Sequence, residues 1–360
     1  MQSNSFTTDQ FIRTWGLVVY NPNSSQALVL SQGSDSSGRE QLRFMFEVRA
    51  VVVPIPNSMV VRIYNPSPNT VQKVIKEFTR ITIAAGYRTG RFATIFDGWI
   101  TQYKYGGETP VDKFLEIYAQ DGDLPINQLT VTGTLMPGAN SQQQVVQYLQ
   151  NKAAPYGLGV GSGVNSVAVS PQSRPTVING MWYDEMGVVS KSSTINGHQG
   201  VIWSIQQGKL VLVPAVGGPV GGETAVINAA TGLIGFPTAT TDGIELRTLL
   251  NPSLHVGQKI QLNNAEINQI AAGMGGGIIN GIGQTINPDQ SLSFFMPVSD
   301  DGMYLAAVVE HHGDTRGQDW YSDIVALTID PTTQMYSKPN EILPSPGDVG
   351  YATGLKNPGS

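Results

Sequence analysis

The chain has 360 residues, a length that favours two or three domains, and 40% of them are hydrophobic, enough for a sizeable core. Only 13% are charged, about half the usual ~25%, and the 41 glycines and 22 prolines indicate a turn-rich β protein with an uncharged polar surface. A net charge of −6 without any lysine- or arginine-rich run argues against nucleic-acid binding, and 0 cysteines exclude disulfides, thiolate metal sites and cysteine nucleophiles.

The sequence shows neither a secretory signal nor an apolar run of membrane-spanning length. The first ten residues, MQSNSFTTDQ, contain no basic region and no apolar segment, so we expect no secretory signal. No run of about 18 apolar residues occurs, so we expect no membrane-spanning segment. The low charge instead suits a chain whose faces are buried against other subunits, because interface cores are depleted of charge.

Strand patterns dominate residues 1–135. The longest, LRFMFEVRAVVV at residues 42–53, is nearly all apolar or β-branched. Its charged residues Arg43, Glu47 and Arg49 share one parity, so one face of this strand is at least partly in water. Further strand-like runs follow up to Leu135. We therefore predict that residues 1–135 form a β module.

One helix is expected inside this module, at SPNTVQKVIKEF (residues 67–78). Asn69 is the predicted N-cap, with Gln72 three residues later at a capping-box spacing. One apolar stripe follows at helical spacing, formed by Val71, Val74, Ile75 and Phe78. The helix should cover one side or end of the sheet.

The pattern changes at Met136. Residues 136–176 contain a short polar helix and the glycine-rich run GLGVGSG (residues 157–163), which we interpret as a flexible linker. Residues 177–223 read as a small mixed α/β domain, with an α segment near residues 181–193. The hairpin VIWSIQQGKLVLVP follows, and Gly208 lies where a tight turn requires positive φ.

Strand patterns return in residues 224–330, the predicted second β module. A glycine-rich excursion at residues 273–283 interrupts it. Residues 331–360, rich in Pro, Gly, Ser and Asn, should form an extended tail. The expected fold class is mainly β with minor α (α+β): a β module, a mixed middle and a second β module.

The segment VVEHHGDTRGQDWYSDIVAL holds two of the four histidines. Two strand-like runs flank a polar loop, which predicts a β-hairpin. Because neighbouring side chains on a strand point to opposite faces, His311 and His312 cannot easily share one metal. His312 and Asp314 could face the same way, but no third ligand follows at a defined spacing. We predict instead a subunit interface formed by His311, Asp314, Arg316 and Trp320, with Asp314 and Arg316 paired across the tip and Trp320 as the anchor.

Other candidate sites lack parts that their chemistry needs. The run at residues 157–163 has no lysine that could meet a phosphate. Asp121 and Asp123 lack the further oxygen ligands of a calcium loop, so a turn is the better interpretation. His198 and His255 stand alone. We predict no catalytic, cofactor-binding or metal-binding residues and no enzymatic activity, although a glycosidase carboxylate pair stays open because its members need not be close in sequence.

Three segments carry a resemblance to a known family. They are FDGWITQYKYGGETPVDKFLEIYAQDGD (residues 96–123), NAATGLIGFPTATTDGIELRTLLNPSLHVGQKIQL (residues 228–262) and the histidine-containing segment above. As a set they resemble baseplate hub proteins of contractile-tailed bacteriophages. Residues 273–283 and the last thirty residues take no part in this resemblance.

The resemblance implies a homotrimer at the centre of the baseplate, located in the virion tail and assembled in the host cytoplasm. Each chain would contribute two tail-tube-like β-barrel domains, with small mixed domains between them. Such a hub adapts the three-fold tail spike to the six-fold tube and lines the channel through which DNA passes without specific binding. The implied partners are the tail spike protein and the tail tube protein or a tube-initiating baseplate protein. Tape measure and baseplate wedge proteins are further candidates.

Two other functions remain open from the sequence. A carbohydrate- or receptor-binding tail protein would need a groove of exposed tryptophan and tyrosine. The 5 tryptophans are scattered, mostly within strand-like runs, which favours core or interface positions: Trp15, Trp99, Trp182, Trp203 and Trp320. A peptidoglycan hydrolase is the third alternative, but the hub plan and the tail use all 360 residues and leave none for a separate hydrolase domain.

Overall fold

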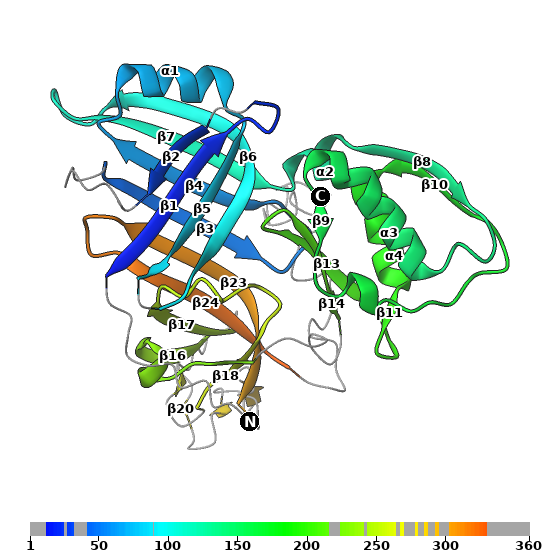
Figure 1. Cartoon of the computed structure of the whole chain (residues 1–360). Coiled ribbons are helices and arrows are strands. Elements are labelled where there is room, and N and C mark those ends of the chain that lie inside the picture. The colour runs from blue at the N-terminus through cyan, green and yellow to red at the C-terminus, as the bar shows by residue number, and fades with distance from the viewer. Residues whose placement is uncertain are drawn as a thin grey trace, which may run out of the picture.

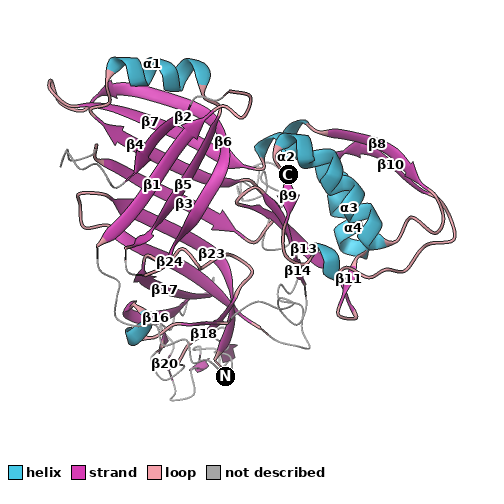
Figure 2. Cartoon of the chain, viewed as in Figure 1, coloured by secondary structure: helices cyan, strands magenta, loops and turns pink. Residues whose placement is uncertain are grey.

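The computed structural model describes residues 12–24, 27–31, 42–88, 90–215, 224–240, 243–263, 267–269, 278–279, 284–286, 292–294 and 302–329. Within these ranges the chain is mainly β with minor helices, which confirms the predicted fold class (Figure 2). The tail at residues 331–360 and most of the excursion at residues 273–283 lie outside them.

One large sheet dominates the structure, with strand order β19-β16-β17-β24-β23-β3-β4-β7-β6-β5-β1-β2 (Figure 1). Its first-module strands are β1 (Arg13–Tyr20), β2 (Ala27–Ser31), β3 (Phe44–Val51), β4 (Asn57–Tyr64), β5 (Arg80–Tyr87), β6 (Phe92–Gly107) and β7 (Lys113–Asp121). Its second-module strands are β15 (Ala225–Val226), β16 (Leu233–Thr240), β17 (Gly243–Leu249), β18 (Lys259–Gln261), β19 (Asn268–Gln269), β23 (Met303–Asp314) and β24 (Trp320–Thr328).

The two predicted β modules are joined edge to edge. Strand β3 pairs antiparallel with β23, from Val51 opposite Val308 to Met45 opposite Asp314. Among the described strands no pairing links the two ends of the path, so neither module closes into a barrel there. The short 3-10 helix η3 (Ala229–Thr231) precedes β16, and β20 (Ile278–Ile279), β21 (Gln284–Ile286) and β22 (Leu292–Phe294) form a separate small sheet.

The predicted helix is present as α1 (Pro68–Glu77), but Ser67 caps it, not Asn69. The Ser67 hydroxyl accepts a hydrogen bond from the Thr70 backbone N–H (3.2 Å). The proline that follows Ser67 suits the first helical position, where its missing N–H costs nothing, so the helix begins earlier than the capping-box spacing suggested. Val71, Val74 and Phe78 are buried, whereas Ile75 lies at the margin of the stripe and is 43% exposed.

Replacing Ser67 by alanine should lower the free energy of unfolding by about 1 kcal/mol, the usual value of a lost side-chain cap. Asn69→Ala is the matched control, because Asn69 lies inside the first turn. Its expected effect on the urea midpoint is close to zero. Equal losses from the two variants would contradict Ser67 as the cap.

The described residues form three hydrophobic clusters. The first-module strands and α1 enclose one, and β17, β18, β23 and β24 enclose another. The third, which we call the middle core, collects buried residues from Ile126 to Leu212. Its elements are α2 (Asp123–Gln128), β8 (Thr130–Leu135), α3 (Gln142–Ala153), η1 (Ala154–Tyr156), β9 (Gly159–Val160), η2 (Val164–Ser166), β10 (Thr176–Met181), α4 (Trp182–Ser192), β11 (Thr194–Ile195), β12 (His198–Gln199), β13 (Val201–Gln206) and β14 (Lys209–Pro214). The division of the chain at residues 135, 176 and 223 stays a prediction.

The run GLGVGSG, expected to be a flexible linker, is packed instead. Strand β9 lies in it and pairs parallel with β14. A Cβ atom on Gly161 would lie 2.3 Å from the Leu210 carbonyl oxygen, and one on Gly163 would lie 2.0 Å from that of Leu212. These glycines therefore allow two backbones to approach closely. In a sequence, a glycine-rich run that serves close packing cannot be told from one that forms a flexible linker.

Candidate functional site

The histidine-containing segment forms the predicted hairpin. Strands β23 and β24 pair antiparallel from Tyr304 opposite Thr328 to Gly313 opposite Trp320, and the polar residues between them form the tip. Because β3 pairs on the other edge of β23, this strand lies inside the sheet. The segment is therefore a structural seam between the two β modules.

His311 lies on the buried face of this seam, with 4% of its surface exposed. Its Nδ1 is 2.8 Å from the Ser322 hydroxyl on β24, and that hydroxyl accepts a hydrogen bond from the Asn251 backbone N–H (3.2 Å). Burial, with a smaller contribution from the neighbouring His312, lowers the pKa of His311 to about 4. His311 is therefore neutral near pH 7 and links the loop after β17 to the hairpin.

The two histidines diverge, as the strand geometry predicted. The His312 ring stacks near Tyr321, with 5.0 Å between ring centroids. Its Nε2 lies 3.7 Å from a Glu310 carboxylate oxygen and 3.8 Å from one of Asp323. Within the described part of the chain no group of three His, Asp or Glu side chains is arranged to hold a metal ion.

Asp314 pairs with Arg43, the residue immediately before β3. The Arg43 Nε donates to Asp314 Oδ1 (3.1 Å) and its Nη2 lies 2.5 Å from Oδ2. Burial raises the pKa of Asp314, but hydrogen bonds from Arg43 and from the Arg316 and Gly317 N–H groups outweigh it, so the pKa is lower than usual. The sequence predicted a pair between Asp314 and Arg316, and the Arg316 backbone N–H donates to Oδ1 (2.9 Å). The pair with Arg43 was not predicted, because 271 residues separate the two partners.

Trp320 packs inside its own chain, with 3% of its surface exposed. Its ring meets Phe46 edge-on at 5.5 Å between centroids, and the Arg13 guanidinium lies 5.5 Å from the ring centroid. The interface role of His311, Asp314, Arg316 and Trp320 stays a prediction. Of the four, Arg316 alone has an exposed side chain in the single chain.

His311 should make the stability depend on pH. Its folded pKa of about 4 is lower than the ordinary value of 6.5, so the unfolded chain binds more protons between these values. The contribution is fully present above pH 6.5 and is lost as the pH falls to 4. We expect the stability advantage of the wild type over His311→Gln to shrink by roughly 2 to 3 kcal/mol between pH 7 and 4.5, since one pKa unit corresponds to about 1.4 kcal/mol. Urea titrations at both pH values measure it, and a constant difference would contradict the assignment.

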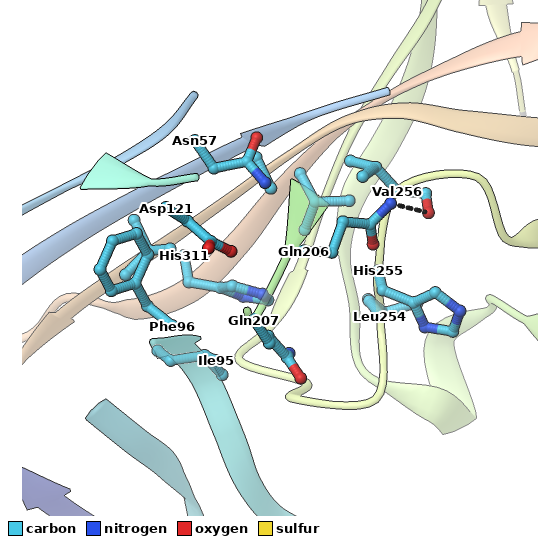
Figure 3. A pocket seen from close by; sticks show the side chains of 13 residues that line it. Asn57, Ile95, Phe96, Asp121, Gln206, Gln207, Leu254, His255, Val256 and His311 are labelled. Atoms are coloured by element: carbon cyan, nitrogen blue, oxygen red, sulfur yellow. Dashed lines mark hydrogen bonds between the residues drawn. The ribbon is translucent and has the colours of Figure 1, made fainter. Parts of the chain in front are cut away.

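A small cavity of about 20 Å³ lies between the first-module and second-module clusters, beside the tip of the β13–β14 hairpin (Figure 3). Asn57, Asp121 and His311 line it from the sheet, and Gln206 and Gln207 reach it from the tip of the β13–β14 hairpin. The loop at residues 254–256 completes the wall.

Asp121 at the end of β7 is the ionisable carboxyl group of this junction. Its two carboxylate oxygens accept hydrogen bonds from the Gly208 N–H, at 3.2 and 3.1 Å. Burial raises the pKa of Asp121 to about 7, although the Gly208 N–H opposes that rise. Asp123 instead begins α2 and accepts a hydrogen bond from Asn127 (2.7 Å). The sequence showed an acidic turn here but not the partner of Asp121, which lies 87 residues away.

A second feature is the outer surface of the large sheet across β17, β24, β23, β3, β4, β7 and β6, which we call the polar face. The strand register places Arg247, Asp323, Glu310 and Arg49 side by side in one row. Its five basic and six acidic side chains have a formal charge of −1: Arg43, Arg49, Arg62, Lys104, Arg247, Glu47, Glu116, Glu245, Glu310, Asp314 and Asp323.

Every arginine of the polar face has a carboxylate partner. The closest N–O distances are 2.5 Å for Arg43 with Asp314, 3.0 Å for Arg49 with Glu310, 2.6 Å for Arg62 with Glu116 and 2.6 Å for Arg247 with Asp323. The exposed pairs, Arg49 with Glu310 and Arg247 with Asp323, contribute only about 0–1 kcal/mol each to stability, whereas the carboxylates of Asp314 and Glu116 are buried. The main effect of the four pairs is to cancel positive charge on a wide surface.

The tryptophans do not form an exposed groove. Trp15, Trp182, Trp203 and Trp320 are buried. Trp99 is half-buried, its Nε1 donates to the Tyr156 carbonyl oxygen (3.1 Å), and the Arg80 guanidinium lies over its ring. This arrangement gives no support to the carbohydrate-binding alternative. The described helices are too short and too polar to cross a membrane.

Comparison with known proteins gives one family. Residues 39–274 match the sequence profile of the family described as baseplate hub gp41. No curated protein sequence matches the chain. Similar solved structures include a 43 kDa tail protein of prophage MuSo2 from Shewanella oneidensis (8% identity, 87% of this chain and 96% of that one, TM-score 0.48). A tail protein from Neisseria meningitidis MC58 has 6% identity over 88% of this chain and 96% of that one, with a TM-score of 0.47. The E. coli c3393 protein, a component of the type VI secretion system, has 11% identity over 82% of this chain and 74% of that one, with a TM-score of 0.45.

Proposed function

The chain belongs to the baseplate hub gp41 family, and on this premise we propose that three copies form the adaptor between a three-fold tail spike and a six-fold tail tube. A symmetry mismatch of this kind needs a subunit that presents two similar surfaces, so that three copies offer six positions. In this proposal the two β modules, which are joined at β3 and β23, provide the two surfaces of each copy. The chain is a structural component of the phage tail baseplate.

We assign the polar face to the lining of the channel. The observation that carries this assignment is the pairing of all four of its arginines with carboxylates. DNA is held mainly through phosphate contacts with unpaired lysine and arginine. A lining with a formal charge near zero and no unpaired arginine lets DNA move past without being retained.

The other parts of the proposal follow from the same role. The chain acts without catalysis or cofactor, and its neighbours are the spike, the tube or a tube-initiating protein, with tape measure and wedge proteins as further contacts. Assembly takes place in the host cytoplasm, within a contractile tail. A cell-wall hydrolase activity would appear as a clearing band in a peptidoglycan gel. Such a band would contradict the proposal that the chain acts without catalysis.

The decisive experiment is the native mass by light scattering, for the chain alone and co-expressed with its spike candidate. We expect a trimer in at least one of the two samples. A stable monomer in both samples would contradict the trimeric adaptor and would favour a receptor-binding role.

A further inference from the structure

The tip of the β13–β14 hairpin is one of the points at which the middle core contacts the large sheet, in addition to the hydrogen bond from Trp99 to Tyr156. Four polar contacts hold it. Asn57 Nδ2 donates to the Ile205 carbonyl oxygen (2.7 Å), and Gln206 Nε2 donates to that of Val256 (3.1 Å), the bond drawn in Figure 3. Gln207 Nε2 donates to the Thr94 carbonyl oxygen (2.9 Å), and the Gly208 N–H donates to Asp121. The attachment is therefore mainly hydrogen-bonded.

The tip fits its seat closely. Gln207 and Gly208 have φ values of 52° and 71°, the conformation that a two-residue hairpin turn needs. A Cβ atom on Gly208 would lie 3.1 Å from Arg80 Nη2, and one on Gly122 would lie 2.5 Å from Ile205 Cδ1. Because the surrounding groups are close-packed, the tip is either fully docked between them or fully released, with little room for intermediate positions.

The nearest cation to Asp121, Arg80, is shared with a second carboxylate. Arg80 on β5 donates to both oxygens of Asp97 on β6 (2.8 and 3.0 Å). His311 on β23 is neutral near pH 7, since burial keeps its pKa at about 4. His255 on the adjoining loop keeps its Nδ1 3.0 Å from the Ser253 carbonyl oxygen. In the closed junction an ionised Asp121 therefore has the backbone N–H groups and the charge of Arg80 in its favour, but burial and the nearby carboxylate of Asp97 oppose ionisation and leave its pKa raised.

We propose that the contact between Asp121 and the tip of the β13–β14 hairpin is a proton-sensitive latch. With the carboxyl group protonated, the tip stays seated and the middle core is held against the sheet. When the proton passes to solvent, the buried carboxylate favours the open junction, where water can solvate it. The latch depends only on contacts within one chain, so it goes beyond the proposed trimer.

Hydrogen exchange measured by mass spectrometry on the full chain tests the latch. After correction for intrinsic exchange rates, we expect opening of the peptide that covers residues 201–214 to rise on the order of 100-fold between pH 5 and 8.5, because the open state has the ordinary aspartate pKa. Peptides from β3 and β4 should not change and serve as the internal reference. In Asp121→Asn, opening of the hairpin should be independent of pH.

Two further variants keep the test decisive. Asp184→Asn removes an exposed carboxylate on α4 and should retain the wild-type pH dependence. Gly208→Ala should increase opening at both pH values, because the added Cβ meets Arg80 at a residue with positive φ. The proposal is overturned if the wild-type hairpin opens equally at both pH values, or if Asp121→Asn keeps the pH dependence.

Discussion

Replacement of Trp320 by alanine is expected to lower the free energy of unfolding by about 3 to 5 kcal/mol, the range found for buried tryptophan and phenylalanine truncations. The ring ends an aromatic row in which Trp15 meets Phe44 at 4.5 Å, Phe44 meets Phe46 at 6.1 Å and Phe46 meets Trp320 at 5.5 Å. Its loss would leave a cavity beneath the hairpin tip.

The same substitution also removes the surface on which Arg13 lies. The Arg13 guanidinium donates to the carbonyl oxygens of Asp314 (3.1 Å), Gly317 (2.6 Å) and Gln318 (2.9 Å), so β1 ties the tip to the first module. We therefore expect the seam between the two modules to loosen in Trp320→Ala.

The urea midpoint, followed by tryptophan fluorescence, measures the effect. Trp99→Ala is the control, since its ring is only half-buried, and should lose clearly less. The interface role predicted for Trp320 from the sequence would instead mean that Trp320→Ala prevents trimer or tail assembly. A variant with unchanged stability that fails to assemble would favour that first interpretation over the packing role.

We expect the polar face to gain affinity for DNA when the carboxylates that pair with its arginines are neutralised. Glu116→Gln, Glu310→Gln and Asp323→Asn together would leave Arg62, Arg49 and Arg247 without their closest carboxylates. Five basic side chains would then face three acidic ones, so the formal charge of the face changes from −1 to +2. We expect duplex DNA to bind roughly 10- to 100-fold more tightly than to wild type at low salt, with the gain lost as salt rises.

A filter-binding titration at several salt concentrations provides the measurement. The matched control replaces three carboxylates on helices outside the polar face, Glu77→Gln on α1, Asp123→Asn on α2 and Asp184→Asn on α4, with the same change in net charge. It should bind DNA no better than wild type. If both triple variants bind DNA equally well, net charge alone is responsible and the assignment of the polar face to the channel loses its support.

Local patterns determined much of the fold. Apolar runs predicted the strands, and the helix at residues 67–78 and the β13–β14 hairpin with its turn at Gly208 are present in the structure. The divergence of His311 and His312 also followed from strand geometry alone, because alternation along a strand is a local property. The sequence did not identify Ser67 as the helix N-cap, because serine and asparagine are both favoured at that position and Asn69 was chosen instead.

Only the tertiary structure decided which residues meet. Arg43 joins Asp314 because β3 pairs with β23, and Asp121 meets Gly208 because the middle core returns to the sheet. The glycine-rich run at residues 157–163 packs against β14. Its role was not predictable, because the role of a glycine depends on the residues that pack beside it. By itself the sequence determined a mainly β chain with a mixed middle and a hairpin that contains the paired histidines. The polar face and the junction at Asp121 arise from pairings between distant strands, which no local pattern encodes.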